Sequence, residues 1–285
     1  GDHIATENIQ LNNNYLSNDG GNEGIRIDDS GNVGIGTNAP SAKLDIVGKL
    51  DLKEDVSNIL ITGGTSNTGN YNVIMGDFAA NNVSSSNNTV IGHQSGRDMS
   101  TAATNTFSGY RSGMQTTTGD DNTAYGGLSL YTIGSGDDNT AIGRSAMQNT
   151  AGGDSNVGIG YQAMYNGQGT SNMGLGKRAL YSVNGNSNVG IGSDAGQSMG
   201  AGASNTFIGS NSGKNTTGSY NVFLGSQSGA SASGSYLLHI ESGVSYNANP
   251  LIYGEFDNDY VKINGDFEST GKVTVGDNVE GNAVN

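Results

Sequence analysis

The sequence predicts an all-β protein built around a parallel β-solenoid, or β-roll, of about ten coils with 16 or 17 residues each. A five-residue block that begins with asparagine, ends with glycine and approximates Asn-Thr-x-Ile-Gly recurs ten times between residues 72 and 225, at spacings of 16 or 17 residues. In all ten copies glycine follows the asparagine by four residues, and alanine or serine follows it by seven. A unit of this length is too short for a pair of helices and fits one coil of short strands and turns.

Composition narrows the possible classes of protein. Glycine contributes 48 of 285 residues, yet the absence of a Gly-X-Y period and the low proline content exclude collagen. The absence of cysteine excludes disulfides, thiolate metal sites and thiol catalysis. A formal net charge of -14 disfavours nucleic acid as a partner. No apolar run reaches the length of a membrane span, so membrane insertion is not expected.

Within each coil we expect the five-residue block to form one strand and the following x-x-Ala/Ser block to form a return strand or a bend. Glycine stands three residues before the asparagine in eight of ten copies, which we interpret as a turn that needs a positive φ. An asparagine at one fixed position would form a ladder in which each amide bonds the next along the axis. This structural ladder comprises Asn88, Asn105, Asn122, Asn139, Asn156, Asn172, Asn188, Asn205 and Asn221.

The predicted core of a single coil is small. We expect it to bury roughly one isoleucine, three residues after the asparagine, and one alanine, which falls short of the ordering entropy. The residue two after the asparagine, such as Phe107, Ala124 or Gly158, would then be apolar or bare on the other face. Such a coil favours a partner, and a closed three-fold oligomer would provide it. We therefore expect the coils to be intertwined or packed as a homotrimer.

The flanking segments break the period and divide the chain into three parts. Residues 1–66 and 231–285 show short alternating strand patterns separated by Gly, Asn and Asp turns. They are expected to be short β-rich caps, or fibre and shaft segments, at the two ends of a solenoid domain over residues 67–230.

Two stretches resemble known proteins. The segment Gly31-Asn-Val-Gly-Ile-Gly-Thr-Asn-Ala-Pro40-Ser-Ala-Lys-Leu-Asp-Ile-Val-Gly48 resembles one found widely in phage tail fibres and related surface fibres. The Asn-Thr-x-Ile-Gly-x-x-Ala repeats are similar to the head repeats of trimeric autotransporter adhesins, which fold as trimers of β-rolls. The repeat is longer here than in those heads, which favours a virion fibre. The resemblance implies a trimeric fibre, host attachment, and contacts with other fibre or virion proteins at the ends.

One group of acidic residues recurs at a 17-residue spacing, which places like charges about 5 Å apart in successive coils. Three interpretations remain open: solvated turns, a Ca²⁺ site that relieves the repulsion, or paired carboxylates of a glycosidase. No other cofactor is expected. The residues are Asp120, Asp121, Asp137, Asp138 and Asp154.

Tyrosines and basic residues recur after the predicted strand, and these are the candidates for receptor binding. Their rings could stack on sugars while the cations hold hydroxyl groups. Alternatively the rings cover the thin core or pack against a neighbouring subunit. The candidates are Tyr110, Arg111, Tyr131, Arg144, Tyr161, Tyr165, Lys177, Arg178 and Tyr181.

The sequence favours a non-enzymatic protein, because its three histidines are far apart and accompany no nucleophile motif. The expected function is that of a structural and adhesive fibre, a phage tail fibre that attaches to a host cell-surface glycan or protein. The expected location is the virion tail or the cell surface. Alternatives are a bacterial trimeric surface adhesin or matrix protein, a polysaccharide-degrading tailspike, and an ice-binding solenoid. The last is motivated by threonine at one repeat position, at Thr89, Thr106, Thr123, Thr140 and Thr206.

Overall fold

The computed structural model describes residues 15–16, 24–37, 39–47, 58–61, 69–243 and 250–272. The chain divides into two compact units, residues 1–55 and residues 56–285. Within the described ranges all regular elements are strands. A search of those ranges for a helix long and apolar enough to cross a bilayer finds none.

The first unit is a four-stranded sheet in the order β1-β2-β3-β4. Its strands are β1 (Tyr15–Leu16), β2 (Ile25–Ile27), β3 (Val33–Ile35) and β4 (Leu44–Ile46). The first three pair antiparallel, whereas β3 and β4 pair in parallel. Within the segment that resembles tail fibres, β3 and β4 form this parallel strand pair.

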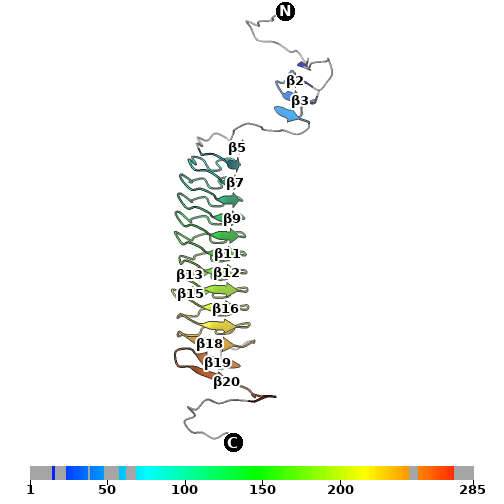
Figure 1. The fold of residues 1–285 in the computed structure, drawn as a ribbon. Helices are drawn as coiled ribbons and strands as arrows, with labels where there is room; N and C mark the ends of the chain where they lie inside the picture. The colour runs from blue at the N-terminus through cyan, green and yellow to red at the C-terminus, as the bar shows by residue number, and fades with distance from the viewer. Residues whose placement is uncertain are drawn as a thin grey trace, which may run out of the picture. The chain divides into compact units, whose positions relative to one another are not determined.

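The second unit is a solenoid around one 14-stranded sheet in the order β20-β19-β18-β17-β16-β14-β12-β11-β10-β9-β8-β7-β6-β5 (Figure 1). A separate pair, β13 with β15, lies on the turn side. The strands are β5 (Asn58–Ile61), β6 (Asn72–Met75), β7 (Thr89–Ile91), β8 (Thr106–Ser108), β9 (Thr123–Tyr125), β10 (Thr140–Ile142), β11 (Val157–Ile159), β12 (Met173–Leu175), β13 (Ser182–Val183), β14 (Val189–Ile191), β15 (Ser198–Gly200), β16 (Thr206–Ile208), β17 (Val222–Leu224), β18 (Leu237–Ile240), β19 (Ile252–Glu255) and β20 (Tyr260–Ile263).

Successive coils stack in parallel and in register, which confirms the predicted fold class. Thr140 pairs with Val157 and Ala141 with Gly158, so each repeat position lies directly over the same position of the next coil. The parallel pairing runs unbroken from β5 to β18. The antiparallel strands β19 and β20 then follow β18 at one end of the sheet.

The two faces of the sheet are the reverse of the sequence expectation. The residue two positions after each asparagine points into the core, where Ile74, Phe107 and Phe223 are fully buried. The aliphatic residue three positions after it points outward, so that Ile91 is 38% exposed and Ile142 is 40% exposed. The expectation that one isoleucine per coil fills the core was therefore wrong. The small residue seven after the asparagine is buried as expected, for example Ala146.

The return side of the coil is made mainly of turns, so a second strand in every coil is not found. Immediately before the coil that begins at Asn139, φ is +58° at Asp138. Within that coil φ is +57° at Ser145 and +51° at Met147. Non-glycine residues rarely adopt this left-handed conformation, yet the same positions adopt it in coil after coil. Their backbone groups bond the neighbouring coils, as Met147 N–H does to the Ala163 carbonyl at 2.9 Å. Hydrogen bonding between coils thereby continues around the turn.

The glycine three residues before the asparagine serves close approach between coils, and Gly218 alone among the eight has a positive φ, of +112°. Gly153 has no left-handed backbone, whereas Ser155, two residues later, does, with a φ of +57°. A Cβ added to Gly153 would lie 2.5 Å from the Gly169 carbonyl oxygen of the next coil. At Gly153 the coils are too close for any side chain, although Ser85 and Ala102 take the same position in two other coils. The sequence interpretation of a positive φ was therefore wrong for seven of these eight glycines.

Core volume is shared between two rows of residues. Where the strand carries glycine, as at Gly158 and Gly174, a Met147 or Met164 side chain from the preceding coil's turn fills the space. Where the strand carries phenylalanine, as at Phe207, the turn carries glycine instead, at Gly213. Large residues thus face small ones, which keeps the core closely packed although its composition varies from coil to coil.

Candidate functional site

The asparagine row is an internal scaffold. Asn139 Oδ1 accepts the backbone N–H of Asn156 at 3.0 Å, and Asn139 Nδ2 donates to the Gly153 carbonyl at 2.8 Å. Asn139 Nδ2 also donates to Asn122 Oδ1 at 3.1 Å. The predicted amide-to-amide contact is thus present, but each side chain mainly satisfies two backbone groups of the next coil. The same pattern recurs at Asn88, Asn105, Asn122, Asn156, Asn172, Asn188, Asn205 and Asn221.

The acidic residues do stack along the solenoid, and backbone donors stabilise one of their two rows. Asp120 N–H donates to Asp137 Oδ1 at 2.8 Å, and Asp137 N–H donates to Asp154 Oδ1 at 3.0 Å. Asp120 in turn accepts the backbone N–H of Ala103 at 2.7 Å. Asp121 and Asp138 occupy the adjoining left-handed position. Within the described ranges, no group of three or more acidic or histidine side chains is close enough to hold a metal ion.

The predicted receptor-binding residues fall into three neighbouring rows and do not converge on one site. Tyr110, Arg144, Tyr161 and Lys177 share the first row, five residues after the asparagine, and all four are exposed. Arg111 and Arg178 occupy the next position. Tyr131, Tyr165 and Tyr181 occupy a third row and are half-buried.

Many of these side chains contact one another. Tyr165 stacks on Tyr181 with ring centroids 5.1 Å apart. Arg178 forms an ion pair with Asp194, with Nε to Oδ1 at 2.8 Å. These contacts favour a structural role for the row that contains Tyr165 and Tyr181 and for the row that contains Arg178.

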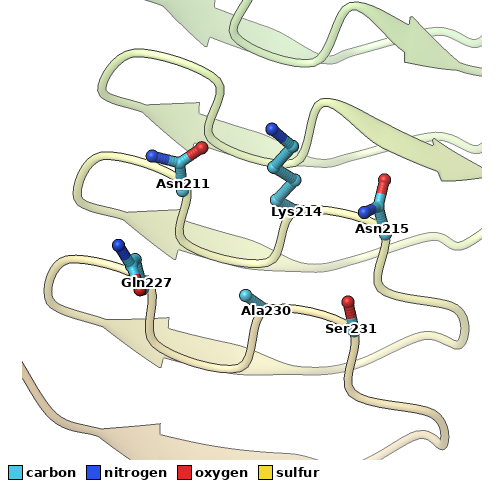
Figure 2. A pocket seen from close by; sticks show the side chains of 6 residues that line it. All are labelled: Asn211, Lys214, Asn215, Gln227, Ala230 and Ser231. Atoms are coloured by element: carbon cyan, nitrogen blue, oxygen red, sulfur yellow. The ribbon is translucent and has the colours of Figure 1, made fainter. Parts of the chain in front are cut away.

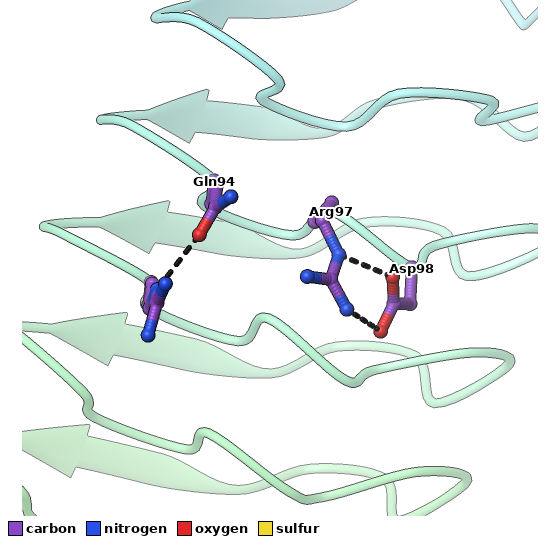
Figure 3. Close-up of polar contacts among 4 residues, drawn as sticks. Gln94, Arg97 and Asp98 are labelled. Atoms are coloured by element: carbon purple, nitrogen blue, oxygen red, sulfur yellow. Dashed lines mark hydrogen bonds and ion pairs between the residues drawn. The ribbon is translucent and has the colours of Figure 1, made fainter.

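A second group surrounds Tyr110. Its ring stacks on His93 at 5.7 Å, and the Arg111 guanidinium lies 4.9 Å from the Tyr110 centroid. Arg111 Nε also donates to Gln94 Oε1 at 2.7 Å, a contact drawn in Figure 3. The same figure shows Arg97 and Asp98 paired through two bonds of 2.6 and 2.8 Å within one turn.

The sequence interpretation missed the outer face of the 14-stranded sheet. Its two rows are the residues one and three positions after each asparagine, and neither row contains a charged residue from Val73 to Ile240. One row is Val73, Thr89, Thr106, Thr123, Thr140, Val157, Met173, Val189, Thr206, Val222 and Leu238; the other is Met75, Ile91, Ser108, Tyr125, Ile142, Ile159, Leu175, Ile191, Ile208, Leu224 and Ile240. We call these two rows the outer sheet face. The alternation of apolar residues in the sequence indicated a sheet with two faces. The sequence interpretation assigned the residue three after the asparagine to the core, whereas the residue two after it lies there.

The architecture defines a β-solenoid repeat protein. Comparisons with protein-family models, with curated proteins and with solved structures find no match to this chain.

Proposed function

We propose that the chain is a segment of a structural and adhesive fibre that associates as a homotrimer and attaches to a cell-surface glycan or protein. A phage tail fibre is the setting that the sequence resemblance favours, and a bacterial trimeric surface adhesin or matrix protein is the alternative. The outer sheet face would lie toward the trimer axis, and the polar turns would face the receptor.

The observation that carries this proposal is the uncharged outer sheet face. Parallel sheets are usually covered on both faces, and this one buries only its inner face within the chain. The rows extend over about eleven coils, or roughly 50 Å at about 4.8 Å per coil. Copies with a charge of -14 repel each other at most surfaces. A neutral face with half-exposed Ile142, Leu175 and Ile208 is where they can meet.

The oligomeric state tests the assembly directly. We expect the purified protein to sediment as a trimer, and Ile142→Lys, at the centre of the outer sheet face, to sediment as a monomer because charge enters an apolar contact. Gln115→Lys adds the same charge on an exposed turn and should remain a trimer. A monomeric wild-type protein would refute the homotrimer.

Attachment is tested with labelled protein and a panel of bacterial strains. Saturable binding that is lost after periodate treatment of the cells would identify a glycan receptor, and loss after protease treatment would identify a protein. A trimer that binds no strain would refute the adhesive role while leaving the assembly intact.

One observation favours a second function, ice binding. Thr89, Thr106, Thr123 and Thr140 lie in register on the outer sheet face. An ice-binding role needs this face free, so it is incompatible with the proposed trimer. Thermal hysteresis in a monomeric preparation would support it, and its absence would dismiss it.

A further inference from the structure

A small pocket lies on the turn side of the solenoid, between the turns that follow β16 and β17. It has a volume of about 100 Å³. Figure 2 shows its lining from matching positions of the two coils, with Asn211, Lys214 and Asn215 above Gln227, Ala230 and Ser231. The register is fixed by backbone bonds, because Ser231 N–H donates to the Lys214 carbonyl at 2.7 Å. The pocket is therefore a feature of the rigid coil stack.

The pocket exists because Ala230 is small. Most other coils carry a long or aromatic side chain at this position, including Arg97, Tyr131, Tyr165 and Gln197. Such a side chain would cover the space below its neighbour, as Tyr181 does below Tyr165. Ala230 leaves the space under the Lys214 backbone open, and the Lys214 side chain extends away from Ala230 toward the preceding coil (Figure 2).

The pocket has a positive charge in an acidic protein. None of its six lining residues is acidic, and Lys214 is the one cation among them. Among the described residues no carboxylate forms an ion pair with Lys214. Two acidic residues of the adjoining coils are engaged elsewhere: Asp194 pairs with Arg178 at 2.8 Å, and Glu241 accepts the Gly229 N–H at 3.2 Å.

The polar groups suit a sugar. Asn211, Asn215 and Gln227 contribute amide donors and acceptors, Ser231 contributes a hydroxyl, and Ala230 is the only apolar side chain. Alternating donors and acceptors match the hydroxyl groups of a sugar ring, while an ammonium group binds a carboxylate in a charge-assisted bond. The volume is below that of pockets that enclose whole ligands, so it admits one ring or its substituent.

We propose that this pocket binds the carboxylate-bearing ring of an acidic glycan. The Lys214 side chain, which extends away from Ala230 in Figure 2, swings toward the pocket to hold the carboxylate, and the amides of Asn211, Asn215 and Gln227 hold ring hydroxyl groups. The inference rests on the proposed adhesive function and names the chemical class of its receptor. It needs no oligomer, because both sides of the pocket come from one chain.

The test measures binding of trigalacturonate and of its methyl ester to the immobilised protein at low and at physiological salt. We expect the acid to bind about tenfold or more tightly than the ester, since a hydrogen bond to a charged group is lost in the ester. Lys214→Gln should remove that preference. Ala230→Tyr, which introduces the residue found at this position in other coils, should abolish binding by filling the pocket.

Lys262→Gln removes a lysine from β20, far along the chain from the pocket, and should bind like the wild type. Circular dichroism melts of each variant confirm the fold. Equal binding of acid and ester, no binding of either, or unchanged binding by Lys214→Gln and Ala230→Tyr would overturn the proposal. Equal binding of hexaglutamate would also overturn it, in favour of an acidic peptide. Sedimentation of the same samples reports separately on the homotrimer.

Discussion

The Met147 side chain occupies the space that a side chain on Gly158 would need. A Cβ added to Gly158 would lie 2.6 Å from Met147 Cγ, although the backbone at Gly158 is not in the left-handed region. The conflict is therefore one of packing between a turn and the strand of the next coil. Gly158 on the strand and Met147 on the turn therefore fill one volume of the core together.

Gly158→Ala should destabilise the solenoid by about 1–3 kcal/mol, because it overpacks a closed core. Met147→Ala should cost about 2–5 kcal/mol by leaving a cavity. The double variant should cost less than the sum, with a coupling of about 0.5–3 kcal/mol measured by equilibrium denaturation. Gly271→Ala, where a Cβ meets nothing within 4 Å, is the matched control and should be near neutral. Strict additivity would refute the coupling.

Asn139→Ala should lower the free energy of unfolding by about 3 kcal/mol, because it leaves the Asn156 N–H and the Gly153 carbonyl unsatisfied in the core. Asn139→Asp keeps the acceptor but places a carboxylate against the Gly153 carbonyl oxygen. It should be at least as damaging at pH 7 and recover partly on acidification, relative to the wild type, as the protonated acid regains a donor. Chemical denaturation measures both effects.

Asn82 is exposed and provides the control, since Asn82→Ala should change stability by less than about 0.5 kcal/mol. An Asn139→Asp variant as stable as the wild type would show that the Nδ2 bond contributes nothing.

Asp137→Asn should raise the melting temperature slightly at low ionic strength, because it keeps the acceptor for the Asp120 N–H and removes one of the stacked charges. The gain should vanish at high salt, where the repulsion is screened. Asp137→Ala should lower the melting temperature at either salt concentration. A melting temperature that rises with added Ca²⁺ in the wild type but not in Asp137→Asn would instead identify the row as a cation site.

The last parallel coil should be sensitive to acid through His239. Burial lowers the pKa of this imidazole below its usual value, and its ring lies against Phe223 at 4.7 Å and Tyr253 at 5.4 Å. The unfolded chain then binds a proton more readily than the folded one. Stability is full above about pH 6.5, falls as pH drops below that value, and levels off beneath the folded pKa.

His239→Phe continues the ring column from Phe207 and Phe223 and should remove this part of the pH dependence. Thermal melts of both proteins at pH 7 and pH 5 measure the difference. An equal loss of stability in the two proteins would show that other groups are responsible.

The repeat predicted much of the fold because each coil makes the same contacts. Asparagine at a spacing of 16 or 17 residues indicated a row of buried amides, and the buried small residues at Ala146 and its equivalents were predicted from their uniform size. The period also indicated the stacking of the Asp120, Asp137 and Asp154 carboxylates. It did not reveal that backbone N–H groups satisfy them, because that depends on the path of the turn in three dimensions.

The sequence alone determined the coil length, the approximate number of coils and the positions that must stay small or amidic, since these are periodic and local properties. The tertiary structure decided which face of the sheet is the core. Alternating apolar residues satisfy either choice, and Gly158 looks too bare for an interior position until Met147 fills it from another coil. It also decided where the pocket beneath Lys214 opens, because a cavity depends on what neighbouring coils leave unfilled.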